Sequence, residues 1–560
     1  MSRTLPANLR SSYNQVPERA AIYLQHAGQD DFSITYKALI EGANGFAKSY
    51  IREGIQPGEV VVLILQHSRE LIYSFWGAVL HGSIPAIMPF LTEKLSPERY
   101  RADLQALIEI TRPSAIVTYP EFEAEVRDAL APDSSVRVVL TTEDIEPASP
   151  PDFDLLPSIN RSATDIVLLQ HSSGTTGLQK GVALSHQAVL NQLEAYSKAI
   201  QLNEDDVIVS WLPLYHDMGL IASFLLPVLT RVPLVLMSPF DWVRAPYRLM
   251  DSVSRYRGTL TWLPNFAYNF CAQKIRARHL DGINLSSWRA IINCSEPVKA
   301  ESHRAFLEAF EPYGLKASAL QTSYAMAENV FGVTQSPLNA TPVVDTVDRL
   351  AFITERLIKP PVDGQPSVEV MSSGRPLANT RLRVLDEKGH DLPERIIGEL
   401  ALQSDCMLTG YYNRPDVTEK SFLDGWYLTG DYGYVADGEV YVTGRKKDIL
   451  IVGGKNVYPQ DLEMLVYEVE GVHPGRAVAF GIYDESAGTE EVVVVAEADG
   501  ISSEEEGQLA DHIRQHVTKN SAIALRYVHI VGPQWILKTS SGKPSRLANR
   551  EKYLAEIAKI

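Results

Sequence analysis

One stretch of the sequence has the residue types and spacing of a phosphate-binding loop. Residues 166–181 read IVLLQHSSGTTGLQKG, so an apolar run leads directly into hydroxyl and glycine residues and then a lysine. Hydroxyls and glycine amides in a tight loop can hold phosphate oxygens, and a lysine just beyond them adds positive charge. The loop is not of the Walker type, because the GxxxxGKS/T spacing is absent. On its own it could equally be a solvated Ser/Thr/Gly loop. The candidate phosphate ligands are Ser172, Ser173, Gly174, Thr175, Thr176, Gly177 and Lys180.

Six further segments follow this loop along the chain. They are WLPLYHDMGL (211–220), NCSEP (293–297), YAMAE (324–328), YLTGD (427–431), GRKKD (444–448) and KTSSGKPSR (538–546). In residue type and in order, the seven elements resemble the adenylate-forming superfamily, which includes acyl-CoA synthetases, luciferases and the adenylation domains of peptide synthetases. The resemblance extends over nearly the whole chain, and seven ordered elements are far more specific than any one of them.

The resemblance implies a defined reaction with ATP and Mg²⁺ as cofactors. A carboxylate attacks the α-phosphate of ATP, pyrophosphate leaves, and an acyl-adenylate forms. The nucleophile is already ionised at pH 7, so the reaction needs no general base. The barrier is charge repulsion and positioning, which cations, backbone amides and Mg²⁺ relieve.

The same resemblance assigns the nucleotide contacts. Tyr324 would stack on adenine, and residues 295–297 would form the opposite wall. Asp431 would accept hydrogen bonds from the ribose hydroxyls, and Arg445 would support the same ribose. Asp431 could instead only cap a turn. The complete implied nucleotide set outside the phosphate loop is Ser295, Glu296, Pro297, Tyr324, Ala325, Met326, Asp431 and Arg445.

Three residues would act on the reacting groups. Lys543 would reach both the carboxylate and the α-phosphate, and Glu328 would position Mg²⁺ with Thr175. His216 would lie near the acyl entrance. The alternatives are a solvated surface lysine, a structural carboxylate and an ordinary buried histidine held by backbone. The order of the motifs favours the functional roles of Lys543, Glu328 and Asp431.

The alternation of short apolar runs with longer amphipathic ones predicts an α/β fold with parallel sheets. The segment 70–80 is predicted to be helical. From Arg381 to about Tyr441, short strands separated by turns predict a small antiparallel region. An α+β pattern follows residue 445, including a helix over 460–470. The predicted strands of the first part are Val60–Leu65, Ser114–Tyr119, Ile166–Gln170, Val207–Trp211 and Pro233–Met237.

The resemblance also predicts two domains, a large N-terminal domain over 1–445 and a mobile C-terminal lid over 446–560, with Lys447 as the pivot. Residues 507–560 contain nine Lys and Arg against three Asp and Glu, in a chain of net charge −17. This local charge could attract nucleotide phosphates and an acidic carrier protein, or could be chance clustering on a solvated helix.

Several features resemble the fatty acyl-AMP ligase branch of the superfamily. The segments 211–220, 262–275 and 285–298 have that branch's form, and Gly374 lies 46 positions after Glu328. The branch carries an insertion here, predicted over about 337–370 and including Val343–Phe352, which is thought to restrict the domain movement needed for coenzyme A.

The implied activity is adenylation of a medium- to long-chain fatty acid, followed by acyl transfer to the phosphopantetheine thiol of an acyl carrier protein. Coenzyme A as acceptor is the alternative, and a catalytically inactive acyl- or nucleotide-binding homologue is a third. No Asp is placed to anchor an amine, which disfavours an amino acid substrate. Apolar or small residues that could line an acyl pocket, or could simply be core, are Met218, Gly219, Leu220, Phe266, Ala267 and Tyr268.

Composition narrows the remaining classes. Hydrophobic residues make up 45% of the 560 residues and charged residues 22%, as in soluble globular proteins. The net negative charge disfavours nucleic acid and anionic lipid as partners. No apolar run reaches the ~18 residues of a membrane helix, and the N-terminus lacks a signal-peptide core. A cytoplasmic enzyme without stable membrane association is expected. Cys271, Cys294 and Cys406 are expected to be packing residues.

Overall fold

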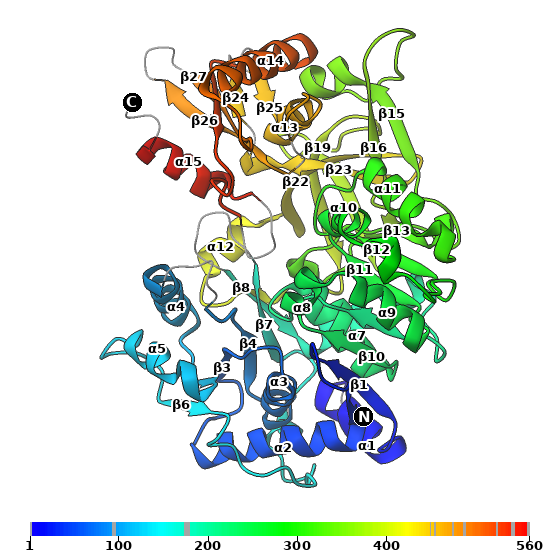
Figure 1. Cartoon of the computed structure of the whole chain (residues 1–560). Helices are drawn as coiled ribbons and strands as arrows, with labels where there is room; N and C mark the ends of the chain where they lie inside the picture. Colours follow the sequence, from blue (N-terminus) through cyan, green and yellow to red (C-terminus); the bar gives the residue numbers. More distant parts are fainter. Residues whose placement is uncertain are drawn as a thin grey trace. The chain divides into compact units, whose positions relative to one another are not determined.

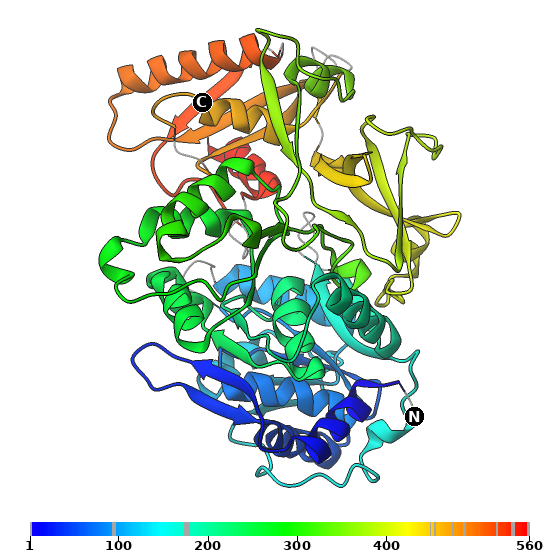
Figure 2. The same ribbon diagram turned by 90° about the vertical axis from the view of Figure 1, so that its right-hand side faces the viewer.

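The computed structural model describes residues 3–91, 97–172, 180–448, 450–452, 455–472, 475–484, 489–521, 523, 525–538 and 544–556 (Figures 1 and 2). Of the predicted site residues, Ser173, Gly174, Thr175, Thr176, Gly177 and Lys543 lie outside this description.

The chain divides into two compact units. Unit 1 comprises residues 1–343, 373–381 and 402–427, and unit 2 comprises residues 344–372, 382–401 and 428–560. Residues 344–370 of the predicted insertion thus belong to the same unit as the C-terminal residues, whereas residues 337–343 belong to unit 1. The predicted domain boundary between residues 445 and 446 remains a prediction.

The first sheet of unit 1 has seven strands in the order β13-β12-β11-β9-β10-β1-β2. Its strand pairs are parallel except for the edge pair of β1 and β2. Strands β9, β10, β11 and β12 are buried along their whole length, as expected for parallel strands covered on both faces. The bounds are β1 Ala20–Gln25, β2 Phe32–Thr35, β9 Ile208–Ser210, β10 Leu234–Met237, β11 Leu260–Leu263, β12 Ala290–Asn293 and β13 Leu320–Thr322.

The second sheet of unit 1 also has seven strands, in the order β20-β8-β7-β4-β3-β5-β6. Strands β3 to β7 pair in parallel, whereas β8 and β20 continue the sheet antiparallel. The predicted strands of both sheets are confirmed within two residues at their ends. The bounds are β3 Val60–Leu63, β4 Ile84–Ile87, β5 Ala115–Thr118, β6 Val138–Thr141, β7 Ile166–Ser172, β8 Lys180–Ser185 and β20 Gly410–Tyr411. A short pair, β14 Thr334–Gln335 with β17 Arg375–Pro376, also belongs to unit 1.

The sequence explains where the helices of unit 1 begin, end and pack. Helix α3 (Arg69–His81) begins where the Ser68 hydroxyl accepts a hydrogen bond from Leu71 N, and it ends at Gly82 with a φ of +91°. Helices α2 and α3 pack side by side (Figure 1). A Cβ at Gly77 would lie 2.4 Å from the Phe46 Cβ, so this close packing requires glycine. The other helices of unit 1 are α1 Leu5–Gln15, α2 Tyr36–Arg52, α4 Pro97–Thr111, α5 Glu123–Asp128, α6 His186–Ala199, α7 Leu226–Thr230, α8 Pro239–Arg244, α9 Tyr247–Tyr256, α10 Asn265–Lys274, α11 Ala300–Phe310 and α12 Pro415–Lys420.

A five-stranded sheet, most of it in unit 2, contains the predicted antiparallel region (Figure 2, yellow). Strand β22 pairs antiparallel with β21 and with β23. The bounds are β18 Thr380–Leu385, β19 Gly398–Ser404, β21 Phe422–Leu423, β22 Trp426–Ala436 and β23 Glu439–Arg445.

The insertion segment of unit 2 forms a hairpin of β15 (Val344–Asp348) and β16 (Ser367–Met371). The C-terminal part has a hairpin of β24 (Leu450–Val452) and β25 (Lys455–Val457) and a three-stranded sheet in the order β26-β27-β28. Its apolar core is formed by these strands and by α13 and α14. The remaining bounds are β26 Ala477–Asp484, β27 Thr489–Glu497, β28 Tyr527–Val531, α13 Pro459–Tyr467, α14 Ser503–Ser521 and α15 Arg546–Glu556.

Two further observations concern the described part of the chain as a whole. None of its helices is both long and apolar enough to cross a membrane. The three cysteines are buried and form no disulfide among these residues, in agreement with their expected packing role.

Candidate functional site

The candidate phosphate loop joins two antiparallel strands of unit 1. Strand β7 extends to Ser172, two residues beyond the predicted end, and β8 begins at Lys180. The two residues are paired directly across the hairpin. The sheet therefore fixes both ends of the loop, while residues 173–179 lie outside the described part of the chain.

The register of three strands places several polar residues on one face of this sheet. Residues opposite each other in an antiparallel pair share a face. Gln170 pairs with Val182, which also pairs with Tyr411 of β20, and Lys180 lies two residues from Val182 on the same strand. The Lys180 ammonium lies 4.7 Å from the centroid of the Tyr411 ring, a cation–π contact.

Glu328 is joined to this face through Tyr411. The Tyr411 hydroxyl donates to Glu328 Oε1 at 2.8 Å, and the Tyr411 and Tyr427 hydroxyls are 2.8 Å apart. Glu328 lies in the short helical turn Ala327–Asn329, and its carbonyl accepts from Leu408 N at 2.8 Å. Burial, and next the Glu328 carboxylate, raises the pKa of Tyr411 and of Tyr427 far above the ordinary value, so both phenols stay protonated. A cation and a carboxylate thus flank one phenol beside the loop.

The backbone before Glu328 is held in an extended conformation. Tyr324 N donates to Thr334 Oγ1 at 3.0 Å. Met326 N donates to Phe331 O at 2.8 Å, and Ala325 forms an isolated antiparallel bridge with Gly332. Tyr324 is buried, at 8% exposed. These contacts fix Tyr324, Ala325 and Met326 in one strand-like segment that leads into Glu328.

The NCSEP segment has an unusual backbone at Ser295. Its φ of +67° is in the left-handed region, which a non-glycine residue seldom adopts and which is often found at functional sites. The Glu296 carboxylate accepts from Phe266 N at 2.9 Å, at the N-terminus of α10, where the helix dipole favours negative charge. Met218 Sδ lies 4.0 Å from Ser295 Oγ. The structure therefore brings segments 211–220 and 293–297 together.

His216 lies two residues before a π-helix over Met218–Leu225, whose N-cap is Asp217. Its carbonyl accepts from Leu220 N at 2.8 Å, its ring is 4.8 Å from that of Tyr215, and the residue is half-buried. A Cβ at Gly219 would lie 2.2 Å from Pro213 O, so the turn at this position requires glycine. The role expected for His216 at an acyl entrance stays a prediction.

In unit 2, Asp431 and Arg445 form a pair across β22 and β23. They are in direct register, and Arg445 Nε lies 3.4 Å from Asp431 Oδ1. The Asp431 backbone N–H donates to Thr429 Oγ1 at 3.0 Å. A carboxylate and a guanidinium held side by side could bind a diol together. Lys447 follows in the 3₁₀ turn Lys446–Asp448.

Sequence reasoning missed Tyr411, Tyr427 and Gln170. Tyr427 lay within a recognised motif, but nothing local marks Tyr411, which reaches the site only through the pairing of β20 with β8. Gln170 is 2% exposed, and neither the nitrogen nor the oxygen of its side-chain amide has a hydrogen-bond partner in the described part of the chain. The sequence signal for this residue was a polar glutamine at the end of the apolar run IVLLQ.

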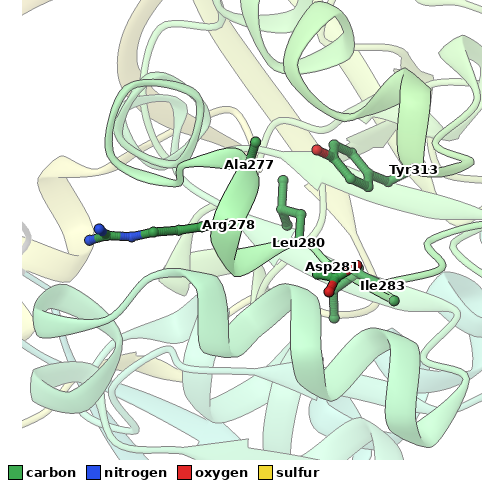
Figure 3. Close-up of a pocket in the computed structure, with 7 residues that line it drawn as sticks. Ala277, Arg278, Leu280, Asp281, Ile283 and Tyr313 are labelled. Carbon is green, nitrogen blue, oxygen red and sulfur yellow. The ribbon is translucent and has the colours of Figure 1, made fainter.

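A shallow surface hollow of about 580 Å³ also lies in unit 1 (Figure 3). In this view the Arg278 side chain extends away from Tyr313. None of the predicted site residues lines it. Its lining residues are Ala277, Arg278, Leu280, Asp281, Gly282, Ile283 and Tyr313.

Comparison with known proteins tests the resemblance. The sequence pattern of the AMP-binding enzyme family matches residues 9–412. This chain belongs to that family. The predicted family resemblance is confirmed, and with it the prediction that the protein is a nucleotide-using enzyme.

The relatives of this AMP-binding enzyme include ligases of fatty acids. It is 29% identical over 563 residues to the medium-chain fatty acid acyl-carrier-protein ligase JamA of Moorena producens strain JHB, covering 97% of this chain and 93% of JamA. It is 29% identical over 568 residues to the long-chain fatty acid AMP ligase FadD32 of Mycolicibacterium smegmatis, covering 92% and 88%.

A solved structure from a study of fatty acyl-adenylate ligases of E. coli and L. pneumophila resembles the AMP-binding enzyme closely. The TM-score is 0.89 at 27% identity, and the match covers 100% of this chain and 99% of the other. The predicted α/β architecture with a smaller C-terminal part is thereby confirmed.

Proposed function

We propose that this enzyme activates a medium- to long-chain fatty acid with ATP and transfers the acyl group to the phosphopantetheine thiol of an acyl carrier protein. In the first step a carboxylate oxygen bonds to the α-phosphorus, the bond to the β-phosphate breaks, and pyrophosphate leaves. In the second step the thiol sulfur bonds to the acyl carbon, its proton is released, and AMP leaves. The names of JamA and FadD32 support this substrate class.

The contact chain Lys180–Tyr411–Glu328 is the observation that carries the first step. A cation at the end of the phosphate loop and a carboxylate are held on either side of one phenol, at 4.7 Å and 2.8 Å respectively. Phosphoryl and adenylyl transfer depend on positioning and on the neutralisation of charge. Lys180 stabilises the charge of the leaving pyrophosphate, and the loop residues Ser172, Ser173, Gly174, Thr175, Thr176 and Gly177 hold its oxygens.

The carboxylate of Glu328 suits a magnesium ion, because Mg²⁺ prefers oxygen ligands. Its carboxylate is a hard oxygen ligand oriented by Tyr411, and a carboxylate accepts several contacts at once. Within the described residues no group of three or more His, Cys, Asp or Glu side chains could hold a metal. Mg²⁺ would therefore be held by Glu328 and Thr175 together with the phosphates of ATP, whose charge it would neutralise.

The other residues divide between substrate recognition and the transition state. Tyr324 stacks on adenine against Ser295, and Asp431 with Arg445 binds the ribose. Lys543 contacts the carboxylate and the α-phosphate during adenylation, and His216 borders the acyl entrance. The strained backbone of Ser295 and the register of Asp431 with Arg445 support these roles. The remaining nucleotide contacts are Glu296, Pro297, Ala325 and Met326.

The packing of the insertion supports a carrier protein rather than coenzyme A as acceptor. Val347 and Phe352 of the insertion share one apolar core with Tyr432 of β22 and with Tyr458, which follows the proposed pivot Lys447. Arg349 also forms an ion pair of 3.2 Å with Glu468, beyond α13. The insertion thus contacts residues before and after Lys447, and these contacts would restrain movement of the chain at Lys447. Such a restraint is expected for an enzyme that does not use coenzyme A.

A product assay tests the proposed function. The full-length enzyme is incubated with ATP, Mg²⁺ and fatty acids of graded length, with either coenzyme A or a phosphopantetheine-bearing carrier protein, and the products are analysed by mass spectrometry. Acylated carrier protein is expected, and carrier protein without phosphopantetheine is the matched control. Rapid formation of acyl-CoA would overturn the proposal that a carrier protein is the acyl acceptor. Absence of ATP–pyrophosphate exchange with every fatty acid would overturn the enzyme activity.

A further inference from the structure

Asn293 connects the two proposed walls of the adenine site in unit 1. It is the last residue of β12, it is fully buried, and the wall of residues 295–297 begins two positions after it. Its backbone oxygen accepts a hydrogen bond from Ser323 N at 3.0 Å, and Ser323 directly precedes Tyr324 of the other wall. The backbone of Asn293 therefore fixes the start of one wall against the start of the other.

The side chain of Asn293 is held by Asn265, the first residue of α10. Asn293 Nδ2 donates to Asn265 Oδ1 at 3.0 Å. The same oxygen accepts from Lys299 N at 3.0 Å, and an amide oxygen has two lone pairs with which to accept both bonds. Lys299 follows the wall of residues 295–297 in the sequence, whereas Asn293 precedes it. One oxygen atom of Asn265 thus bridges the two ends of the segment that carries this wall.

The surrounding contacts fix the orientation of both amides. The backbone N–H of Lys299 can only donate, so Asn265 presents its oxygen, and Asn293 must present its nitrogen to that oxygen. The second hydrogen of this nitrogen faces His303 Nε2 at 3.1 Å, which therefore accepts. Burial lowers the pKa of His303 to about 4, in agreement with a neutral ring. Asn265 Nδ2 donates in turn to Ser302 Oγ at 3.0 Å, so the bridge has a single satisfied arrangement.

We infer that Asn265 is a positioning residue that sets the place of the 295–297 wall in the adenine site. The next residue of α10 holds the same wall, because Phe266 N donates to the Glu296 carboxylate at 2.9 Å. Between these contacts the backbone of Ser295 has a φ of +67°, an unfavourable conformation that persists only where the surroundings hold it. Asn265 acts through the wall and does not itself bind the nucleotide. This inference rests on the proposed roles of residues 295–297 and Tyr324.

Calorimetric titration of the full-length protein with AMP and with inorganic pyrophosphate tests this role. Asn265→Leu removes the bridging oxygen and is expected to raise the Kd for AMP by about 10-fold, the effect of losing one or two hydrogen bonds that hold the wall. The Kd for pyrophosphate should change by less than about 2-fold, because the phosphate loop and Lys180 hold it without the wall. Asn265→Asp keeps the acceptor oxygen and should bind AMP at least about 3-fold more tightly than Asn265→Leu. Equal weakening for AMP and pyrophosphate would overturn the inference.

The matched control is Asn269→Leu, one turn later on α10. Asn269 Nδ2 also donates to Ser302 Oγ at 3.0 Å, but among the described residues it forms no hydrogen bond with the segment 293–299. Both leucine variants lose a bond to Ser302, so thermal unfolding should show a loss of stability in each. The Kd for AMP in Asn269→Leu should nevertheless stay within about 2-fold of the wild type, because the bridge is intact. A purely structural role of Asn265 would instead weaken AMP binding equally in the two variants.

A second variant removes the other end of the bridge. Asn293→Ala should weaken AMP binding as Asn265→Leu does, and the double variant should add less than about 2-fold, since residues that act as a unit are not additive. In ATP–pyrophosphate exchange, either variant should raise the KM for ATP while kcat stays within about 3-fold of the wild type, because the wall is remote from the reacting phosphate. Unchanged AMP binding in either folded single variant would overturn the inference. If the wild type bound AMP but activated no fatty acid, only the proposed function would fail.

Discussion

Tyr411 donates a hydrogen bond to Glu328 Oε1 at 2.8 Å, although the two residues lie 83 positions apart in the sequence. The bond exists because β20 pairs with β8 and so places Tyr411 opposite Val182, two residues from Lys180 at the end of the proposed phosphate loop. The same ring lies beneath the Lys180 ammonium. Tyr411 thus orients Glu328, which together with Thr175 is proposed to hold Mg²⁺.

The first prediction concerns this phenol. Tyr411→Phe keeps the ring for Lys180 but removes the donor to Glu328. A hydrogen bond to a charged group contributes about 1.5–3 kcal/mol, so ATP–pyrophosphate exchange should fall by roughly 10- to 100-fold. Part of the loss should be recovered at higher Mg²⁺. The control is Tyr412→Phe, because Tyr412 packs against the apolar core on the opposite face. Equal rates of ATP–pyrophosphate exchange in the two variants would show that the Tyr411 hydroxyl has no role in adenylation.

The second prediction concerns Lys543. Lys543→Ala should lower adenylation by at least roughly 10²-fold, by analogy with the loss of one group that stabilises transition-state charge. Transfer of the acyl group from supplied acyl-adenylate to the carrier protein should be affected much less, because the α-phosphate bond is then already formed. The two steps are measured by ATP–pyrophosphate exchange and by single-turnover mass spectrometry. Near-normal exchange in this variant would mean that Lys543 is misassigned.

The elements that follow a local pattern were predictable from the sequence. Continuous apolar runs identified β3, β5 and β10, because parallel strands buried on both faces need no polar alternation. The candidate phosphate loop was recognisable from its composition. The bond between Tyr411 and Glu328 was not, since strand register is set by non-local pairing. The positive φ of Ser295 and the packing of the insertion beside Tyr458 likewise depend on tertiary contacts.

The third prediction concerns the insertion. Deleting Val343–Phe352 should increase the formation of acyl-CoA relative to acylated carrier protein. The deletion also removes Val347 and Phe352 from a shared core, so the milder variant Phe352→Ala is measured in parallel. Such a truncation costs about 3–5 kcal/mol of stability, which thermal unfolding will detect. Val362→Ala, at a position 62% exposed in the same segment, is the control. An unchanged thiol preference in both insertion variants would count against the restraint.

The fourth prediction concerns pH and His171, which lies between Gln170 and Ser172 on β7. Burial lowers the pKa of His171 from 6.5 to about 4, and neither ring nitrogen has a hydrogen-bond partner in the described part of the chain. The unfolded chain therefore binds more protons than the folded one between about pH 6.5 and pH 4. Stability is fully present above pH 6.5 and falls as the pH is lowered through this window, by on the order of 1 kcal/mol per pH unit.

This loss can be measured by urea unfolding at pH 7.5, 6.0 and 5.0. His81, His186 and His303 have pKa values lowered in the same direction by burial, so the total loss should exceed the share of His171. His171→Gln should flatten the pH dependence of stability because glutamine does not titrate. A pH dependence that is the same in His171→Gln as in the wild type would show that the histidine before the phosphate loop titrates normally.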